Sequence, residues 1–318
     1  MWLNIFLFII GFIFLIKGAD LLVDGSSAIA KKFKISNLVI GLTIVSFGTS
    51  APELLVNIMA SFKGSADIAI GNIIGSNIAN LLLILGLAAV IYPLKVKHGT
   101  TWKEIPLSLL AIIVVGLLLN DQLIDKIDPS MLSRIDGFVL LLFFIIFLYY
   151  TFGIAKVEGQ DNEQIKHEPV IKSLIMISIG ILGLYLGGQW IVNGAVFFAI
   201  KFGLSEALIG LTIIAVGTSL PELAASAMAA YKHNADIAVG NVVGSNIFNL
   251  FWILGISSII NPIIFNVVLN TDIMILIIGT VMLFSFMFIG TKHLMNRWQG
   301  SLFIVGYFVY IVFLIIRG

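Results

Sequence analysis

Long apolar segments separated by short polar loops restrict the fold of this chain more than any other feature. Each is close to the roughly 20 residues that a helix needs to cross the hydrocarbon core of a bilayer. The composition agrees, with 59% hydrophobic and 11% charged residues, whereas soluble domains carry about 25% charged residues. The segments are residues 3–22, 38–62, 68–92, 104–120, 135–155, 170–200, 206–231, 235–260, 270–291 and 298–316. We therefore predict an all-α polytopic protein of the cell membrane, with ten transmembrane helices in contact with the lipid bilayer.

The chain is internally duplicated. A shift of 169 residues aligns Gly41–Gly86 with Gly210–Gly255, and about 28 of these 46 positions are identical, which indicates a true repeat. Each copy holds five predicted spans, and an odd number makes the second copy enter the membrane from the opposite side. The halves 1–155 and 170–318 are therefore predicted to be inverted repeats, a construction common in secondary transporters. The polar stretch 156–169 is too short to fold as a domain and is interpreted as a linker.

The distribution of Lys and Arg predicts how the chain is oriented. Twelve of these residues lie in loops on one side of the predicted membrane and five on the other. The positive-inside rule places the first side and the linker in the cytoplasm and both termini outside the cell. The net charge of +1, without a long basic run, gives no reason to expect a nucleic-acid partner, and no obligate protein partner is evident. The chain has no cysteine, which excludes disulfide and zinc–thiolate chemistry.

Two apolar segments are interrupted at their centres by related motifs, GTSAPELL at 48–55 and GTSLPELA at 217–224. The proline of each motif cannot donate a backbone hydrogen bond and disfavours helix at the preceding residue. The second and seventh spans are therefore predicted to be broken there, and in lipid such backbone survives only where protein buries it or where it lines a cavity. Glu53 and Glu222 follow the prolines, and a carboxylate near mid-membrane indicates a functional site. A protonated, hydrogen-bonded core glutamate is the alternative, and its duplication in the same context argues against it.

Oxygen-bearing side chains accompany each glutamate. Thr49 lies four residues before Glu53, and Asn72, Ser76 and Asn80 share one stripe of the next span. The second copy repeats this pattern with Thr218, Glu222, Asn241, Ser245 and Asn249. Carboxylate, hydroxyl and amide oxygens without His or Cys suit hard cations such as Na⁺ and Ca²⁺. The sequence therefore predicts a hard-cation site between the two copies.

Neighbouring polar and small residues have simpler interpretations. Asn77 and Asn246 lie one position off the stripe, and interhelical hydrogen bonding suits them at least as well as ion contact. Asp236, at the start of the eighth span, is a predicted helix cap. The GxxxG pairs at 71–75 and 240–244 are predicted helix-packing contacts.

An intramembrane enzyme and a channel are the competing classes of function. An enzyme needs a nucleophile and a base, but the four histidines lie in loops near the membrane edges, and no general-base constellation accompanies the glutamates. Similar oxygens can line a channel, but two broken helices in inverted copies favour alternating access over a fixed pore. The sequence therefore predicts a transporter that is not an enzyme and uses no cofactor.

The paired segments GTSxPEL…GNxxGSNIxN resemble the α-repeats of the sodium/calcium exchangers, within the calcium/cation antiporter superfamily. The motif is long and occurs twice, and the ten-span plan is similar to that of compact prokaryotic-type members over the whole chain. The Ca²⁺/H⁺ antiporter branch is less similar, because its repeats typically carry GNxxE in place of GTSxPE. The linker 156–169 is short, so the resemblance implies that the large regulatory Ca²⁺-binding domains of animal exchangers are absent.

The resemblance also implies one compact site in which Glu53 and Glu222 are shared by Ca²⁺ and Na⁺. Further oxygens would come from the side chains of Thr49, Ser50, Ser76, Asn80, Thr218, Ser219, Ser245 and Asn249 and from the backbone carbonyls of Ser46 and Ala215. Asn249 stands where potassium-dependent relatives carry an acid, which suggests that K⁺ is not cotransported. The expected function is electrogenic antiport of several Na⁺ for one Ca²⁺, with sliding of the first and sixth helices to switch access. Antiport of Ca²⁺ or another divalent cation against H⁺ is the alternative, and a cation channel is a more distant one.

Overall fold

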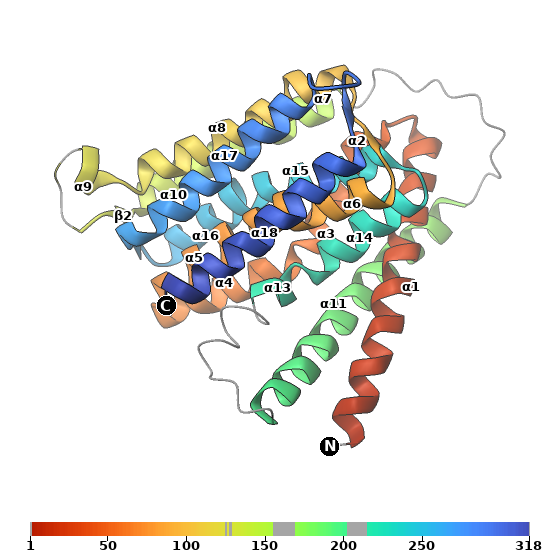
Figure 1. The fold of residues 1–318 in the computed structure, drawn as a ribbon, viewed down its shortest axis with the longest axis horizontal. Helices are drawn as coiled ribbons and strands as arrows, with labels where there is room; N and C mark the ends of the chain where they lie inside the picture. Colours follow the sequence, from red (N-terminus) through yellow and green to blue (C-terminus); the bar gives the residue numbers. More distant parts are fainter. Residues whose placement is uncertain (1, 125, 127–128, 155–168, 202–214, 318) are drawn as a thin grey trace.

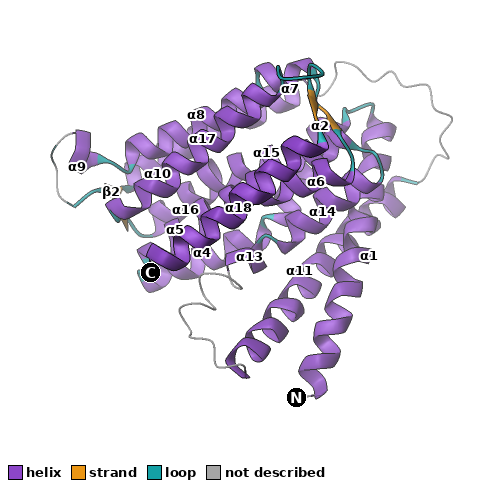
Figure 2. Ribbon diagram, in the orientation of Figure 1, coloured by secondary structure: helices purple, strands orange, loops and turns teal. Residues whose placement is uncertain are grey.

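The computed structural model describes residues 2–124, 126, 129–154, 169–201 and 215–317, and it is helical apart from two short β-ladders (Figure 1, Figure 2). The first half contains α1 (Trp2–Phe33), α2 (Asn37–Ile40), the π-helix η1 (Gly41–Val45), α3 (Ser46–Thr49), α4 (Ala51–Lys63), α5 (Ala66–Ile78), the π-helix η2 (Ala79–Ile84), α6 (Leu85–Ile91), α7 (His98–Trp102), α8 (Glu104–Leu118), α9 (Asp121–Ile124) and α10 (Arg134–Ile154). The second half contains α11 (Val170–Lys201), α13 (Ala215–Thr218), α14 (Leu220–Tyr231), α15 (Ala235–Ile247), the π-helix η4 (Phe248–Ile253), α16 (Leu254–Ile260), the 3₁₀ turn η5 (Val267–Leu269), α17 (Asn270–Phe286) and α18 (Arg297–Arg317). The strands are β1 (Leu94–Lys95), β2 (Met131–Leu132), β3 (Ile263–Ile264) and β4 (Leu294–Met295).

The predicted all-helical membrane fold is confirmed. Within the described ranges, eight helices are long and apolar enough to cross a membrane, and the bent pair Asn37–Thr49 and Ala51–Lys63 makes a ninth. The predicted seventh span, 206–231, is described only from residue 215 onward, so the count of ten stays a prediction. The predicted linker also falls outside the described residues, apart from Pro169.

Two long, continuous helical stretches form the centre of the bundle. One runs through α5, η2 and α6, and the other through α15, η4 and α16, with every boundary shifted by the 169 residues of the sequence repeat. Protein buries 78% of the most apolar window in each stretch, against 28% for α1, α10, α11 and α18. Apolar character alone does not separate a central helix from a lipid-facing one, because both are hydrophobic all round. Small and polar residues mark the central pair instead.

Glycines allow α15 to approach η1 closely. A Cβ atom on Gly240 would lie 2.8 Å from the carbonyl oxygen of Leu38, just before η1, and one on Gly244 would lie 2.9 Å from the Cα atom of Leu42 in η1. Both distances are too short for any other residue, as in small-xxx-small contacts of membrane helices. The predicted packing role is therefore confirmed in the second copy and stays a prediction for Gly71 and Gly75 in the first.

The helices α1 and α11 pack against each other at one edge of the bundle (Figure 1). A Cβ atom on Gly18 would lie 2.7 Å from the backbone nitrogen of Leu184, and one on Gly180 would lie 2.7 Å from that of Leu22. The backbones of the two helices therefore touch without intervening side chains, which leaves a smooth contact between the first helices of the two halves.

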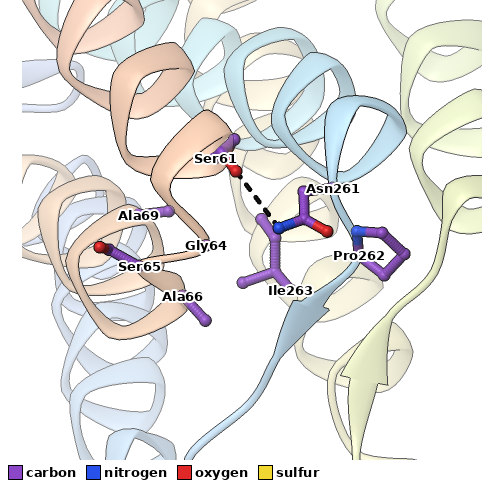
Figure 3. Close-up of a pocket in the computed structure, with 8 residues that line it drawn as sticks. All are labelled: Ser61, Gly64, Ser65, Ala66, Ala69, Asn261, Pro262 and Ile263. Carbon is purple, nitrogen blue, oxygen red and sulfur yellow. Dashed lines mark hydrogen bonds between the residues drawn. The ribbon is translucent and has the colours of Figure 1, made fainter.

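The two halves also meet outside the helices. β1 pairs with β4 and β2 with β3, so each ladder joins one half to the other. Figure 3 shows a small pocket at the turn between α4 and α5, where Asn261 Nδ2 donates to the carbonyl oxygen of Ser61 at 3.2 Å. Gly64 in this turn has φ +70°, which glycine adopts without strain, and its counterpart His233 has φ +59°. No charged residue lines this pocket, so it is distinct from the site at the helix breaks.

Candidate cation site

Both predicted helix breaks are present. Ser50, between α3 and α4, has φ −82° and ψ 6°, and Ser219, between α13 and α14, has φ −86° and ψ 5°. These angles lie in the sparsely populated bridge region, where many active-site residues are found. The prolines two residues later lack an N–H, so the carbonyls of Gly48 and Gly217 lose their normal helical donor. The first break bends its span by 49°.

The two glutamates are buried and are held by the opposite halves of the chain. Glu53 is 1% exposed and Glu222 is 0% exposed, each in the first turn of the helix after its break. Ser50 Oγ donates to Glu222 Oε1 at 2.8 Å, and Ser219 Oγ donates to Glu53 Oε1 at 3.3 Å. This exchange brings the two breaks face to face, as the repeated motif predicts.

A second pair of hydrogen bonds crosses between the halves beside the glutamates. Thr49 Oγ1 donates to Asn241 Oδ1 at 3.1 Å, and Thr218 Oγ1 donates to Asn72 Oδ1 at 3.4 Å. These contacts also correspond under the shift of 169 residues. The threonine before each break therefore donates a hydrogen bond to the first asparagine of the polar stripe in the other half.

Asn80 and Asn249 occupy equivalent places on the two central helical stretches. Each lies in the first turn of a π-helix, and its backbone carbonyl accepts from the N–H group five residues later. Such widened turns are frequent at functional sites. Asn80 Nδ2 donates to Asn246 Oδ1 at 3.1 Å, and Asn249 Nδ2 donates to Asn77 Oδ1 at 2.9 Å. The interhelical hydrogen bonding predicted for Asn77 and Asn246 is confirmed.

Several predicted ligand atoms are buried oxygens with no hydrogen-bond partner in the described part of the chain. They form three repeat-related pairs, namely Oε2 of Glu53 and Glu222, Oγ of Ser76 and Ser245, and Oδ1 of Asn80 and Asn249. A buried polar atom without a partner costs about 1–3 kcal/mol. Oxygen donors of these three kinds match the preference of hard cations. The sequence places no Lys, Arg or His at 37–62, 66–92, 215–231 or 235–260 to occupy the site instead.

The two predicted backbone ligands lie just before the breaks. The carbonyl of Ser46 accepts from the N–H of Ser50 at 2.9 Å and from Thr49 Oγ1 at 3.3 Å. Ala215 is the first residue of α13. Both stay predicted ligands, at the first residues of the short helices α3 and α13.

Sequence reasoning missed two residues that support the site. Asn57 Nδ2 donates to the carbonyl oxygen of Glu53 at 3.0 Å, and its counterpart Ser226 accepts from Asn241 Nδ2 at 2.9 Å. Each lies four residues after its glutamate, so helical spacing was the signal that pointed to them.

The prediction that Asp236 caps the eighth span was wrong. Asn234 caps α15, since its side chain accepts from the N–H of Ile237 at 3.3 Å. Asp236 instead forms an ion pair with Lys97 at 2.9 Å. Asn234 is the better cap because it occupies the position just before the first helical residue.

The fold and these contacts define a polytopic membrane protein with a buried cluster of carboxylate, hydroxyl and amide oxygens where two broken helices meet. The model of the sodium/calcium exchanger protein family matches residues 3–153 and 172–316. The chain belongs to the sodium/calcium exchanger family. Because this is a family of membrane antiporters, membership supports a transporter over an enzyme.

Individual relatives agree with this assignment along nearly the whole chain. The chain is 37% identical over 309 residues to the putative antiporter CaxA of Alkalimonas amylolytica, covering 95% of each protein. It is 31% identical, over an alignment of 348 positions, to the sodium/calcium exchanger MaX1 of Methanosarcina acetivorans, and the alignment covers 98% of each protein. A solved structure of the sodium–calcium exchanger NCX_Mj, soaked with 10 mM Na⁺ and zero Ca²⁺, superposes with a TM-score of 0.85 at 36% identity, covering 98% of each chain.

Proposed function

We propose that the protein exchanges several Na⁺ for one Ca²⁺ across the cell membrane by alternating access. Family membership and the similarity to MaX1 and NCX_Mj support this proposal. The observation that carries it is the set of three repeat-related pairs of buried oxygens, centred on two glutamates that each half presents to the other. Such a set suits a hard cation and offers nothing to a nucleophilic reaction.

In the proposed site, coupling arises because both ions need the same carboxylates. Glu53 and Glu222 together neutralise one Ca²⁺, and several Na⁺ use the same oxygens in its place. The proposed ligands are the side chains of Thr49, Ser50, Glu53, Ser76, Asn80, Thr218, Ser219, Glu222, Ser245 and Asn249 and the backbone carbonyls of Ser46 and Ala215. The site cannot hold both loads together, so one ion enters only when the other leaves. Asn249 adds no third carboxylate, which favours transport without K⁺.

The proposed orientation places both termini outside the cell and relates the halves 1–155 and 170–318 by inversion across the linker 156–169. The excess of Lys and Arg on one side supports this orientation. The hydrogen bonds that cross between the halves support the two-fold relation, since each has a counterpart 169 residues away. Alternating access around a central site is the mechanism typical of such inverted repeats.

The test is ⁴⁵Ca²⁺ uptake into proteoliposomes loaded with Na⁺ or with K⁺, for the wild type and for Glu53→Gln and Glu222→Gln. We expect uptake only with internal Na⁺ and its loss in both variants, because each variant removes half of the charge that balances Ca²⁺. Glu104→Gln is the matched control. Glu104 is also 1% exposed, but it lies in α8, where the hydroxyl of Tyr150 donates to it, and no hydrogen bond among the described residues joins it to a proposed ligand.

The other outcomes separate the alternatives. Uptake that does not depend on internal Na⁺ but is driven by an outward proton gradient indicates a Ca²⁺/H⁺ antiporter. Uptake that needs no counter-ion indicates a channel. Uptake that survives both glutamate substitutions would show that the ions bind elsewhere.

A further inference from the structure

Four buried asparagines lie side by side where the two central helical stretches cross. Asn77, Asn80, Asn246 and Asn249 are 0%, 1%, 2% and 0% exposed, respectively. Asn80 and Asn249 belong to the proposed ligand set, whereas the function proposed above gives Asn77 and Asn246 no part. An asparagine amide presents an oxygen on one side and an NH₂ group on the other. Only the oxygen attracts a cation, so the direction in which each ligand amide points decides whether it binds or repels the ion.

A backbone carbonyl determines the direction of the Asn77 amide. Asn77 Nδ2 donates to the carbonyl oxygen of Asn246 at 3.3 Å. A carbonyl can only accept, so the NH₂ group of Asn77 must face it, and Asn77 Oδ1 faces the other way. Asn249 Nδ2 donates to this Oδ1 at 2.9 Å. The oxygen of Asn249 is consequently turned away from Asn77 and has no hydrogen-bond partner among the described residues.

The amide-to-amide bond recurs with the halves exchanged, whereas the bond to a backbone carbonyl is present for Asn77 alone among the described residues. Asn80 Nδ2 donates to Asn246 Oδ1 at 3.1 Å, and Asn80 Oδ1 likewise has no partner in the described part of the chain. Asn77 therefore accepts from the NH₂ group of Asn249, and Asn246 accepts from that of Asn80, each from the opposite half. The two unpartnered amide oxygens join those of the glutamates and of Ser76 and Ser245 as free acceptors.

We propose that Asn77 and Asn246 are positioning residues that hold the amides of Asn249 and Asn80 with their oxygens toward the transported cation. This inference rests on the function proposed above. Without Asn77, the Asn249 amide can turn about its last side-chain torsion, and its NH₂ group then takes the place of a ligand oxygen. Because the contact crosses between the halves, it also keeps the two stripes of ligands in register.

A double-mutant cycle tests the role of Asn77. The KM for Ca²⁺ is measured by Na⁺-driven ⁴⁵Ca²⁺ uptake for the wild type, Asn77→Leu, Asn249→Ala and the double variant. We expect Asn77→Leu to raise the KM about tenfold or more, the size typical of losing a residue that orients a metal ligand. In the Asn249→Ala background, the same change should alter the KM by less than about twofold, because the amide to be oriented is gone. Equal effects in both backgrounds would overturn the inference.

Two further variants separate positioning from general packing. Asn249→Asp places an oxygen on both sides of the group, so the KM in this background should become insensitive to Asn77→Leu; a tenfold response there would contradict the proposed role. Asn120→Leu is the matched control, because Asn120 forms a reciprocal amide pair with Asn270, at 2.8 and 2.7 Å, away from the site. It should leave the KM unchanged. An equal rise of the KM in Asn120→Leu would assign the effect to general packing and overturn the inference.

The repeat provides an independent second cycle, with Asn246→Leu and Asn80→Ala, which keeps the inference testable if Asn77→Leu does not fold. Wild-type uptake without dependence on Na⁺ would overturn the proposed function and, with it, the inference. Na⁺-driven uptake with additive effects in the cycles would overturn the inference alone.

Discussion

At the scale of single residues, each of the two buried glutamates has one carboxylate oxygen available to a cation. One oxygen of each accepts from a serine of the opposite half, and the other has no partner in the described part of the chain. Two carboxylates in one buried cluster also repel each other, which disfavours their being ionised together without a positive charge between them. A cation bound at the unpartnered oxygens would give them a partner and would also offset the repulsion between the two carboxylates.

The first prediction follows from this repulsion and concerns acid. A proton and Ca²⁺ compete for the same carboxylate oxygens, so lowering the pH should raise the KM for Ca²⁺ and leave the maximal rate of uptake unchanged. The measurement is initial ⁴⁵Ca²⁺ uptake at several Ca²⁺ concentrations between about pH 5 and pH 8. A KM that stays constant across this range would show that protons do not reach the site.

At the scale of elements, ion pairs join the C-terminal half of α1 to the core. Lys232, just past the end of α14, forms ion pairs with Asp20 at 2.5 Å and with Asp24 at 2.6 Å, both on α1. Burial by itself lowers the pKa of Lys232, but the two carboxylates outweigh burial and raise it above its ordinary value. The lysine therefore stays charged, and both ion pairs persist at neutral pH.

The equivalent residues in the other half cannot form these two ion pairs. The shift of 169 residues relates Lys232 to Lys63, and it relates Asp20 and Asp24 to Gln189 and Asn193. Two carboxylates are thus replaced by two neutral amides, and all three of these counterparts are exposed. The repeat is therefore charged at one end of the helix pair α1 and α11 and neutral at the other.

The second prediction is that Lys232→Gln loosens α1 at the charged end. Since the chain has no cysteine, Ser26→Cys supplies a single probe at a fully buried position of α1. We expect a maleimide added from that side to label it up to about fivefold faster in the Lys232→Gln background, because a half-exposed ion pair contributes up to about 1 kcal/mol. Lys63→Gln is the matched control and should leave the rate unchanged. Equal rates in all three backgrounds would mean that the ion pairs do not hold α1.

At the scale of the whole molecule, the two halves both contribute to the candidate site, so in the proposed mechanism each transport step would carry an ion through the centre of the bundle. The central stretches are mostly buried by protein, while α1 and α11 touch through glycine at the edge. A smooth glycine contact allows one pair of helices to move while the ligands stay in place. Alternating access requires this combination of helices that move and a central site that stays in place.

The third prediction concerns membrane voltage. If at least three Na⁺ leave for each Ca²⁺ that enters, net positive charge leaves the vesicle, so a positive interior should accelerate uptake and a negative interior should slow it. Each net charge is worth about 2.3 kcal/mol per 100 mV. The potential is set with K⁺ gradients and valinomycin, and vesicles without valinomycin are the control. Identical rates at both potentials would indicate electroneutral exchange.

Much of the candidate site was predictable because its signals are local. A proline inside a helical segment removes a backbone donor and disfavours helix at the residue before it, so the breaks next to Ser50 and Ser219 follow from the motifs alone. The cap of α15 was mispredicted because two polar residues compete near its start, and backbone geometry selects Asn234 over Asp236. Asn57 was missed although it lies four residues after Glu53, because its NH₂ group donates to a backbone carbonyl, a role that differs from that of an ion ligand.

The sequence by itself determined the membrane class, the duplication, the broken helices and the residues that supply oxygens, because hydropathy, proline and repeat spacing act along the chain. The tertiary structure alone decided which oxygens meet. The bonds from Ser50 to Glu222, from Asn249 to Asn77 and from Lys232 to Asp24 join residues 172, 172 and 208 positions apart. Such pairings depend on how closely the glycine-lined helices of the two halves approach, and that distance is a property of the packed bundle.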